Sequence, residues 1–249
     1  MWRFRRAVSV AGLLTLLCVV SNLPAQQSPA GAGAPQGART PALFFREDWK
    51  LDPKIPPSAP PNAFEQEHTL GQGDVANPNL ELKKYGDTTG PVIVYQPSVG
   101  NITFAMTMLC TSNCAQALRD KSNYVDLTGL ARIRWRTKVG GFHQLHPILK
   151  LADGTWLVGD RSTGFSSDWV ESDFLLQDFR WRNLDIENVV EGKDGKWVDN
   201  PDLSKVDEIG FTDLMRGTGH GNGGGSRIDW IEVYGKPVPR GTAAQTSAR

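Results

Sequence analysis

Apolar and polar residues alternate repeatedly along the middle of the chain, and this alternation predicts β-strands. Residues 102–108 alternate in this way, and so do residues 131–138, whose polar face carries Arg132, Arg134 and Arg136. Further strands are predicted at residues 147–151, 155–159, 175–182, 209–214 and 227–234. Many short strands in a chain of this size predict an all-β fold, namely a two-sheet antiparallel β-sandwich of the jelly-roll kind.

Two of these strand predictions carry further expectations. Residues 147–151 and 155–159 flank an Asp-Gly dipeptide, which is typical of a tight hairpin. Residues 175–182 alternate as one strand with Arg180 and Arg182 on its polar face. If that strand neighboured residues 131–138, the arginines of both would form a basic face suited to an acidic or heavily hydroxylated glycan. The alternative is a solvated face on which these arginines pair with acids of adjoining strands.

Composition changes at both ends of the chain and indicates the domain limits. Residues 1–25 have the layout of a signal peptide, because Arg3, Arg5 and Arg6 precede an apolar run that ends near a small residue. An uncleaved anchor is the alternative. Residues 26–42 are rich in Ala, Gly, Pro, Gln and Ser, which predicts a disordered linker. We therefore expect one β-sandwich domain at residues 43–236 and a disordered tail at residues 237–249.

Charge and hydropathy restrict the partners and the compartment. The 249 residues include 27 basic and 27 acidic side chains, so the net charge is zero. Removing residues 1–25 takes away three arginines and no acid, which leaves 24 − 27 = −3. That charge argues against nucleic acid, since proteins that bind it carry a basic surface. No later stretch has the roughly 18 apolar residues of a membrane span. The sequence predicts a secreted or periplasmic protein.

Cys110 and Cys114 are the two cysteines that follow the expected signal peptide. In an oxidising compartment, an even pair at short spacing predicts a disulfide. Three intervening residues do not match the two-residue spacing of a redox motif. Two free thiols are the alternative.

Three phrases of the sequence resemble carbohydrate-binding modules of the galactose-binding-like jelly-roll family. Residues 124–136, which begin Tyr-Val-Asp-Leu-Thr-Gly, are similar to the start of a core strand in many of these modules. Residues 206–211 and 226–234 resemble their two closing strands, and residues 44–49 look like their opening strand. The resemblance spans most of residues 44–235. It implies a jelly roll whose ligand is a polysaccharide or other glycan.

The same resemblance implies a structural calcium ion. Sugar-binding jelly rolls often hold Ca²⁺ with acids of the first and last strands, and carboxylate oxygens suit that ion. The matching positions are Glu47 or Asp48 on the first strand and Asp229 on the last. The alternative is that Asp229 pairs with a nearby arginine.

Tryptophans are the first candidates for binding a sugar, because an indole plane matches the apolar C–H face of a sugar ring. Trp135, Trp181 and Trp230 lie in alternating runs and are expected in the core. Trp156, Trp169 and Trp197 lie beside turn residues and are candidates for an exposed platform. With the polar side chains that could join them, the candidate carbohydrate-binding residues are Arg134, Arg136, His143, Trp156, Arg161 and Trp169.

A non-catalytic carbohydrate-binding protein is therefore the favoured function, and an enzyme is the first alternative. A glycoside hydrolase with a concanavalin-like sandwich would use paired carboxylates. Glu171 and Asp173 begin a laminarinase-like pattern, but Leu176 occupies the position of its last glutamate, so no catalytic residue is assigned. The second alternative is a cell-envelope module that binds other proteins, which an exposed apolar patch would indicate.

Overall fold

The computed structural model describes residues 40–56, 66–97, 100–107, 109–193, 196–215 and 225–241. All of them belong to one compact unit, Gly37–Arg249. The expected signal peptide, most of the expected linker and residues 242–249 lie outside the described residues. In the described part of the chain, no helix is long and apolar enough to cross a membrane.

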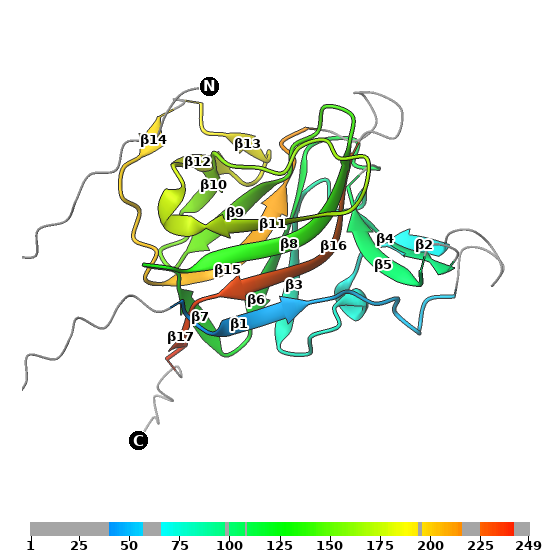
Figure 1. Cartoon of the computed structure of the whole chain (residues 1–249), viewed down its shortest axis with the longest axis horizontal. Coiled ribbons are helices and arrows are strands. Elements are labelled where there is room, and N and C mark those ends of the chain that lie inside the picture. Colours follow the sequence, from blue (N-terminus) through cyan, green and yellow to red (C-terminus); the bar gives the residue numbers. More distant parts are fainter. Residues whose placement is uncertain are drawn as a thin grey trace, which may run out of the picture. The chain divides into compact units, whose positions relative to one another are not determined.

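Two antiparallel sheets enclose a hydrophobic core, which confirms the predicted β-sandwich (Figure 1). The first sheet has the order β11-β8-β16-β5-β4-β2, with β1 also beside β16. Its strands are β1 (Leu43–Glu47), β2 (Gln66–Thr69), β4 (Val92–Gln96), β5 (Ile102–Met106), β8 (Arg132–Gly140), β11 (Val170–Leu175) and β16 (Gly225–Tyr234).

The second sheet has the order β13-β12-β10-β9-β15-β6-β3, with β14 beside β12, β7 beside β15 and β17 beside β7. Its strands are β3 (Leu80–Gly86), β6 (Cys114–Asp120), β7 (Asn123–Asp126), β9 (His146–Leu151), β10 (Trp156–Gly159), β12 (Trp181–Asp185), β13 (Val190–Glu191), β14 (Trp197–Val198), β15 (Val206–Thr212) and β17 (Lys236–Pro239). Short 3₁₀ helices interrupt the strands, among them η1 (Gln72–Asp74) and η3 (Leu176–Asp178).

Period-two alternation decides which side chains fill the core. Along β8, every second residue is buried. Ile133 and Trp135 of this strand point into the core, together with Ile231 of β16 and Phe211 of β15. The buried Trp135 Nε1 donates a hydrogen bond of 2.9 Å to Thr163 Oγ1, so its polar atom is satisfied. The alternation that predicted these strands is therefore the pattern that builds the core.

The predicted hairpin is confirmed, but the predicted single strand at 175–182 is wrong. β9 and β10 pair as neighbours, and Gly154 in their connection has a φ of 92°, which glycine adopts without strain. Residues 175–182 instead contain the end of β11, the turn η3 and the start of β12. The chain leaves the first sheet and joins the second there. Alternation continues across the break, so it hides the change of sheet.

The chain stays ordered beyond the expected domain end. Residues 236–239 form β17, which pairs with β7, although residues 237–249 are predicted as a disordered tail. Arg240 then anchors the segment, because its Nη1 lies 2.5 Å from Asp207 Oδ1. The prediction is therefore wrong for residues 237–240. The polar composition of the segment concealed a strand that binds an exposed edge.

Cys110 and Cys114 form the predicted disulfide, with a Cα–Cα distance of 6.3 Å. Both residues are buried. Asp87 holds the same loop, because its carboxylate accepts hydrogen bonds from the backbone N–H and the hydroxyl of Thr111. The disulfide and the Asp87 carboxylate together hold the chain between β5 and β6.

Candidate functional site

The edge of β16 is divided between two strands. β5 pairs with Arg227 and Ile228, and β1 pairs with β16 only from Ile231 onward. Between these two partners the register of β16 against β8 shifts, so that Asp229 is the extra residue of a bulge. A bulge re-aims side chains and bends its strand. This one places Asp229 where β1 and β5 separate.

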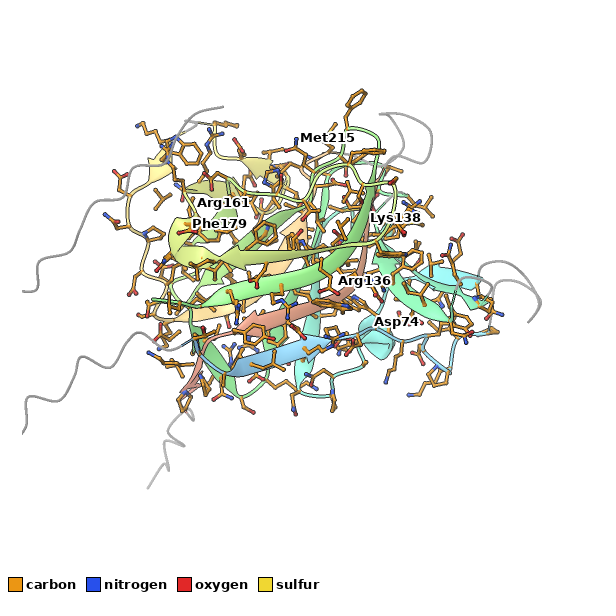
Figure 2. The ribbon with its side chains drawn as sticks, in the orientation of Figure 1. Asp74, Arg136, Lys138, Arg161, Phe179 and Met215 are labelled. Carbon is orange, nitrogen blue, oxygen red and sulfur yellow. A yellow bond between two sulfur atoms is a disulfide. The ribbon has the colours of Figure 1, made fainter. Side chains whose placement is uncertain are left out.

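An open pocket of about 580 Å³ lies at this separation and is called the first pocket. Its lining comes from the ends of β1 and β5, from β8, from β16 and from the segment before β11. The lining residues are Asp48, Trp49, Gly100, Asn101, Ile102, Thr103, Arg136, Asp168, Trp169 and Asp229. Figure 2 labels Arg136, which lies on the broad side of the first sheet.

An ion pair and an aromatic ring form the centre of the first pocket. Arg136 Nη1 lies 2.5 Å from Asp229 Oδ2. Burial raises the pKa of Asp229, while the hydrogen bond and charge of Arg136 act to lower it. The guanidinium carbon of Arg136 is also 5.3 Å from the centroid of the half-buried Trp169 ring. Trp169 packs edge-on against Phe104 at 5.4 Å, which fixes the ring at the pocket.

Two residues that line the first pocket have left-handed backbone conformations. Trp49 has a φ of 50° and Asn101 a φ of 57°. Asparagine tolerates this region, whereas a bulky side chain rarely adopts it. Val189 and Leu214, which line neither pocket, also have positive φ. The conformation of Trp49 therefore shows that the structure around it holds the residue at the rim of β1.

Two of the predicted carbohydrate-binding residues, Arg136 and Trp169, line the first pocket. Arg134 shares their sheet face but not the pocket, because its guanidinium contacts Glu171 at 3.3 Å and Glu232 at 3.2 Å. Arg161 lies elsewhere, over the ring of Phe179.

The expectation that His143 and Trp156 are accessible to a ligand is wrong. The His143 side chain is fully buried, and its Nδ1 lies 3.0 Å from Asp213 Oδ2. Trp156 is 7% exposed, on the side of the second sheet that faces away from the main core. Leu184 of β12 and Val189 of the segment that follows it pack in the same cluster and cover that side.

The arginine face is neutralised by acids rather than free for an anion. β8 and β12 belong to different sheets, so their arginines do not form one basic surface. Opposite β8, Asp173 pairs with Arg132 at 3.1 Å. Arg134 pairs with acids of β11 and β16, and Arg136 pairs with an acid of β16. Charges of both signs therefore alternate on this face. The alternative of a solvated, ion-paired face is therefore confirmed for the arginines of β8.

Glu171 and Asp173 are the carboxylates that an enzyme would need on this face, and both take part in the same ion pairs. Glu171 and Asp173 both point to the side of β8 that carries its arginines. Each already contacts a guanidinium. The pair therefore serves as counter-charge to the arginines of β8.

Asp48 and Asp229 both line the first pocket, but they do not fit a resident calcium ion. Arg46 binds both carboxylate oxygens of Asp48, at 2.8 and 2.9 Å, and Arg136 binds Asp229. Glu47 is fully buried, and its oxygens accept three backbone N–H groups. Calcium takes about six to eight oxygen ligands. Among the described residues, no three His, Cys, Asp or Glu side chains are grouped to hold a metal.

Sequence reasoning missed Trp49, Asn101 and Asp168 as pocket residues. Asn101 follows Gly100, and this pair marks a turn that tolerates positive φ. Asp168 closes the polar Ser-Ser-Asp cluster before Trp169, which marks a loop. No local pattern shows that these two turns meet, because their meeting depends on the pairing of β5, β16 and β8.

Comparisons with known proteins give matches among solved structures only. No protein-family model and no curated protein matches the chain. The family 11 carbohydrate-binding module of the cellulase Lic26A-Cel5E of Clostridium thermocellum is 16% identical over 76% of this chain and 94% of that chain. A structure of a family 11 module from the same organism with a β-1,3-1,4-mixed-linked tetrasaccharide is 15% identical, over 78% and 98%. A family 29 carbohydrate-binding module is 15% identical, over 68% and 88%.

All three matches have a TM-score of 0.37. The matched structures are of the class that the sequence phrases resemble. At these identities and TM-scores, the likeness carries no argument about what this chain binds or where.

Proposed function

We propose that this chain is an exported, non-catalytic carbohydrate-binding protein whose first pocket binds a glycan. One observation carries the proposal, namely that the ring of Trp169 lies beside the Arg136–Asp229 ion pair in an open pocket. Protein sites for sugars combine an aromatic plane for the C–H face with a few placed polar groups for the hydroxyls. The layout of residues 1–25 as a signal peptide supports export.

The residues of the first pocket contact the glycan in two ways. The Trp169 ring supplies apolar contact, and the Arg136 N–H groups donate to sugar hydroxyls. The carboxylates of Asp48, Asp168 and Asp229 accept from hydroxyls. Arg46 and Arg136 balance Asp48 and Asp229, and Asp168 leaves an excess negative charge that repels an anionic ligand, so the pocket favours a neutral glycan rich in hydroxyls.

The proposal is tested by incubating the purified chain with neutral polysaccharides and with acidic ones, with and without calcium. Bound protein and released reducing ends are read from the same wells. We expect retention on a neutral polysaccharide without release of sugar ends. Retention on none of them, or release of reducing ends, would contradict non-catalytic binding. A need for calcium would show that Asp48 and Asp229 hold an ion despite their arginines.

Variants assign the binding to the first pocket. Trp169→Ala removes the ring, and we expect the affinity to fall by about tenfold or more. Trp169→Phe keeps an aromatic side chain against Phe104 and separates loss of contact from loss of packing. Arg161→Ala is the matched control, because Arg161 is a predicted binding residue that does not line the pocket. Equal losses in Trp169→Ala and Arg161→Ala would contradict the assignment.

A further inference from the structure

A smaller pocket of about 280 Å³ lies at the edge of the second sheet and is called the second pocket. η3 and the start of β12 form one wall, and β14 with the chain after it forms the other. Its apolar lining includes Leu176, Phe179, Trp181 and Leu203. Phe179 stacks on Trp181 at 5.1 Å, so the aromatic wall is rigid. Figure 2 shows Phe179 and Arg136 in separate regions of the molecule, so the two pockets are distinct.

Arg180 is the unusual polar group of the second pocket. Its guanidinium carbon is 3.8 Å from the centroid of the Trp197 ring. Among the described residues, the Arg180 side chain has no ion-pair or hydrogen-bond partner. Arg182 is also close to Trp197, at 4.1 Å, but it donates to Glu191. Two arginines thus contact one ring, and only one of them has its charge matched.

A guanidinium that contacts an aromatic ring keeps N–H donors free in its own plane. The fork of two parallel N–H groups matches the two oxygens of a carboxylate. The ring of Trp197 also limits the conformations of the Arg180 side chain, so less entropy is lost when the fork binds. Arg180 is therefore arranged to receive a carboxylate from outside the protein.

The rest of the second pocket suits a small polyhydroxylated ring. Gln177, Asp199 and Asn200 supply oxygen acceptors at the exposed rim, above the apolar wall. Asn200 has a φ of 47°, so this pocket also contains a residue in the left-handed region. The volume is at the small end of ligand pockets, which begin at about 300 Å³. That size fits one sugar ring rather than a chain of them.

We propose that the second pocket binds a single uronate residue, that is, a sugar ring that carries a carboxylate. The carboxylate meets Arg180, the hydroxyls meet the rim acceptors, and the C–H face lies toward Val198 and Pro201, the half-buried apolar residues in front of the buried aromatic wall. The first pocket has a different charge balance, because its lining carries three carboxylates and one guanidinium, whereas the second carries one of each, Asp199 and Arg180. The two pockets thus select different sugars, and the second does not depend on the proposed function of the first.

The test is a titration of the whole chain with methyl glucuronide, with methyl glucoside as the neutral analogue of the same ring. We expect the glucuronide to bind at least tenfold more tightly than the glucoside, because a hydrogen bond to a charged group contributes about that factor. Arg180→Gln removes this preference. Arg182→Gln is the matched control, because Arg182 also contacts Trp197 but does not line the pocket, and this variant keeps the preference. Trp169→Ala, in the first pocket, leaves glucuronide binding unchanged.

Several results would overturn the proposal. Equal binding of glucuronide and glucoside, or binding of neither, would show that Arg180 does not select a uronate. Competition by acetate as strong as that by glucuronide would show an anion site that does not recognise the ring. An equal loss in Arg182→Gln would show that the basic edge acts as a whole. Loss of neutral-glycan binding in Trp169→Ala alone bears on the first pocket only, so failures of the two proposals are distinguishable.

Discussion

Arg136 Nη1 lies 2.5 Å from Asp229 Oδ2, and this ion pair joins β8 to the bulge of β16. The pair is half-buried, with 35% of the Arg136 side chain and 14% of the Asp229 side chain exposed. Burying charges costs free energy that their attraction does not always offset. The raised pKa of Asp229 shows that burial outweighs the partner at this position. The pocket therefore holds a carboxylate whose ionised form is disfavoured by burial.

Asp229→Asn should change how stability depends on pH. A carboxyl whose pKa rises on folding contributes stability that is present below its unfolded pKa, about 3.9, and lost as pH rises through the folded pKa. Asparagine removes this loss. We expect the free energy of unfolding of the variant, relative to the parent chain, to increase between about pH 3 and about pH 7. Urea denaturation at both pH values measures it.

The control for this prediction is Asn101→Ala, which changes a pocket residue that does not titrate. Its effect on the free energy of unfolding should be the same at both pH values. If the difference for Asp229→Asn also stays constant, burial does not govern the ionisation of Asp229.

His146 should make the protein less stable as the solution becomes acidic. Burial lowers the pKa of His146, although its hydrogen bond of 2.9 Å to the carbonyl of Gly159 opposes the shift. A histidine whose pKa falls on folding contributes stability that is present above its unfolded pKa, about 6.5, and lost as pH drops through the folded pKa. His146→Gln should flatten the decline in unfolding midpoint between about pH 7.5 and about pH 5. An unchanged slope would assign the decline to other groups.

Asp87 should stabilise the disulfide loop only when it is ionised. Burial alone would raise the pKa of Asp87, but hydrogen bonds from Thr111, Gly90 and Thr89 bring it well below its usual value. Such a group contributes stability above its unfolded pKa that is lost as pH falls. Asp87→Asn should therefore destabilise the chain at neutral pH, and the difference should shrink as pH falls below about 4. Thermal unfolding across that range tests it, and a constant difference would contradict it.

The strands were predictable because the period of alternation is a local property. β8 carries its core side chains at every second residue, β16 does so on each side of its bulge at Asp229, and the alternation in residues 131–138 and 227–234 is visible before any pairing is known. The turn η3 was not predicted, because Phe179 and Trp181 continue the same alternation beyond it. Local pattern thus identifies a strand but not the sheet to which it belongs.

The candidate site was predictable only in part, because it depends on register. Arg136 and Asp229 were both singled out, one for sugar and the other for a metal, and only the pairing of β8 with β16 shows that they meet. Trp156 was wrongly predicted to be exposed, because a segment distant in the sequence covers it. The segment that covers it lies about thirty residues later in the sequence, beyond the reach of any turn signal. Contacts between distant segments therefore decide which tryptophans a ligand can reach.

Gly159→Ala should disturb the second pocket without touching its polar groups. A Cβ at this position would lie 2.5 Å from Cδ1 and 2.6 Å from Cε1 of Phe179, so the ring must move from its stack on Trp181. Overpacking of this kind costs about 1–3 kcal/mol. We expect weaker binding of methyl glucuronide and a lower free energy of unfolding, while retention on a neutral polysaccharide is unchanged.

Gly164→Ala is the control, because its Cβ would meet only Gln144 Cγ at 4.0 Å. Adding Phe179→Leu to Gly159→Ala makes room for the new methyl group and should recover part of the stability but not the binding. Full recovery of binding in that double variant would show that the stack of Phe179 on Trp181 does not set the shape of the pocket.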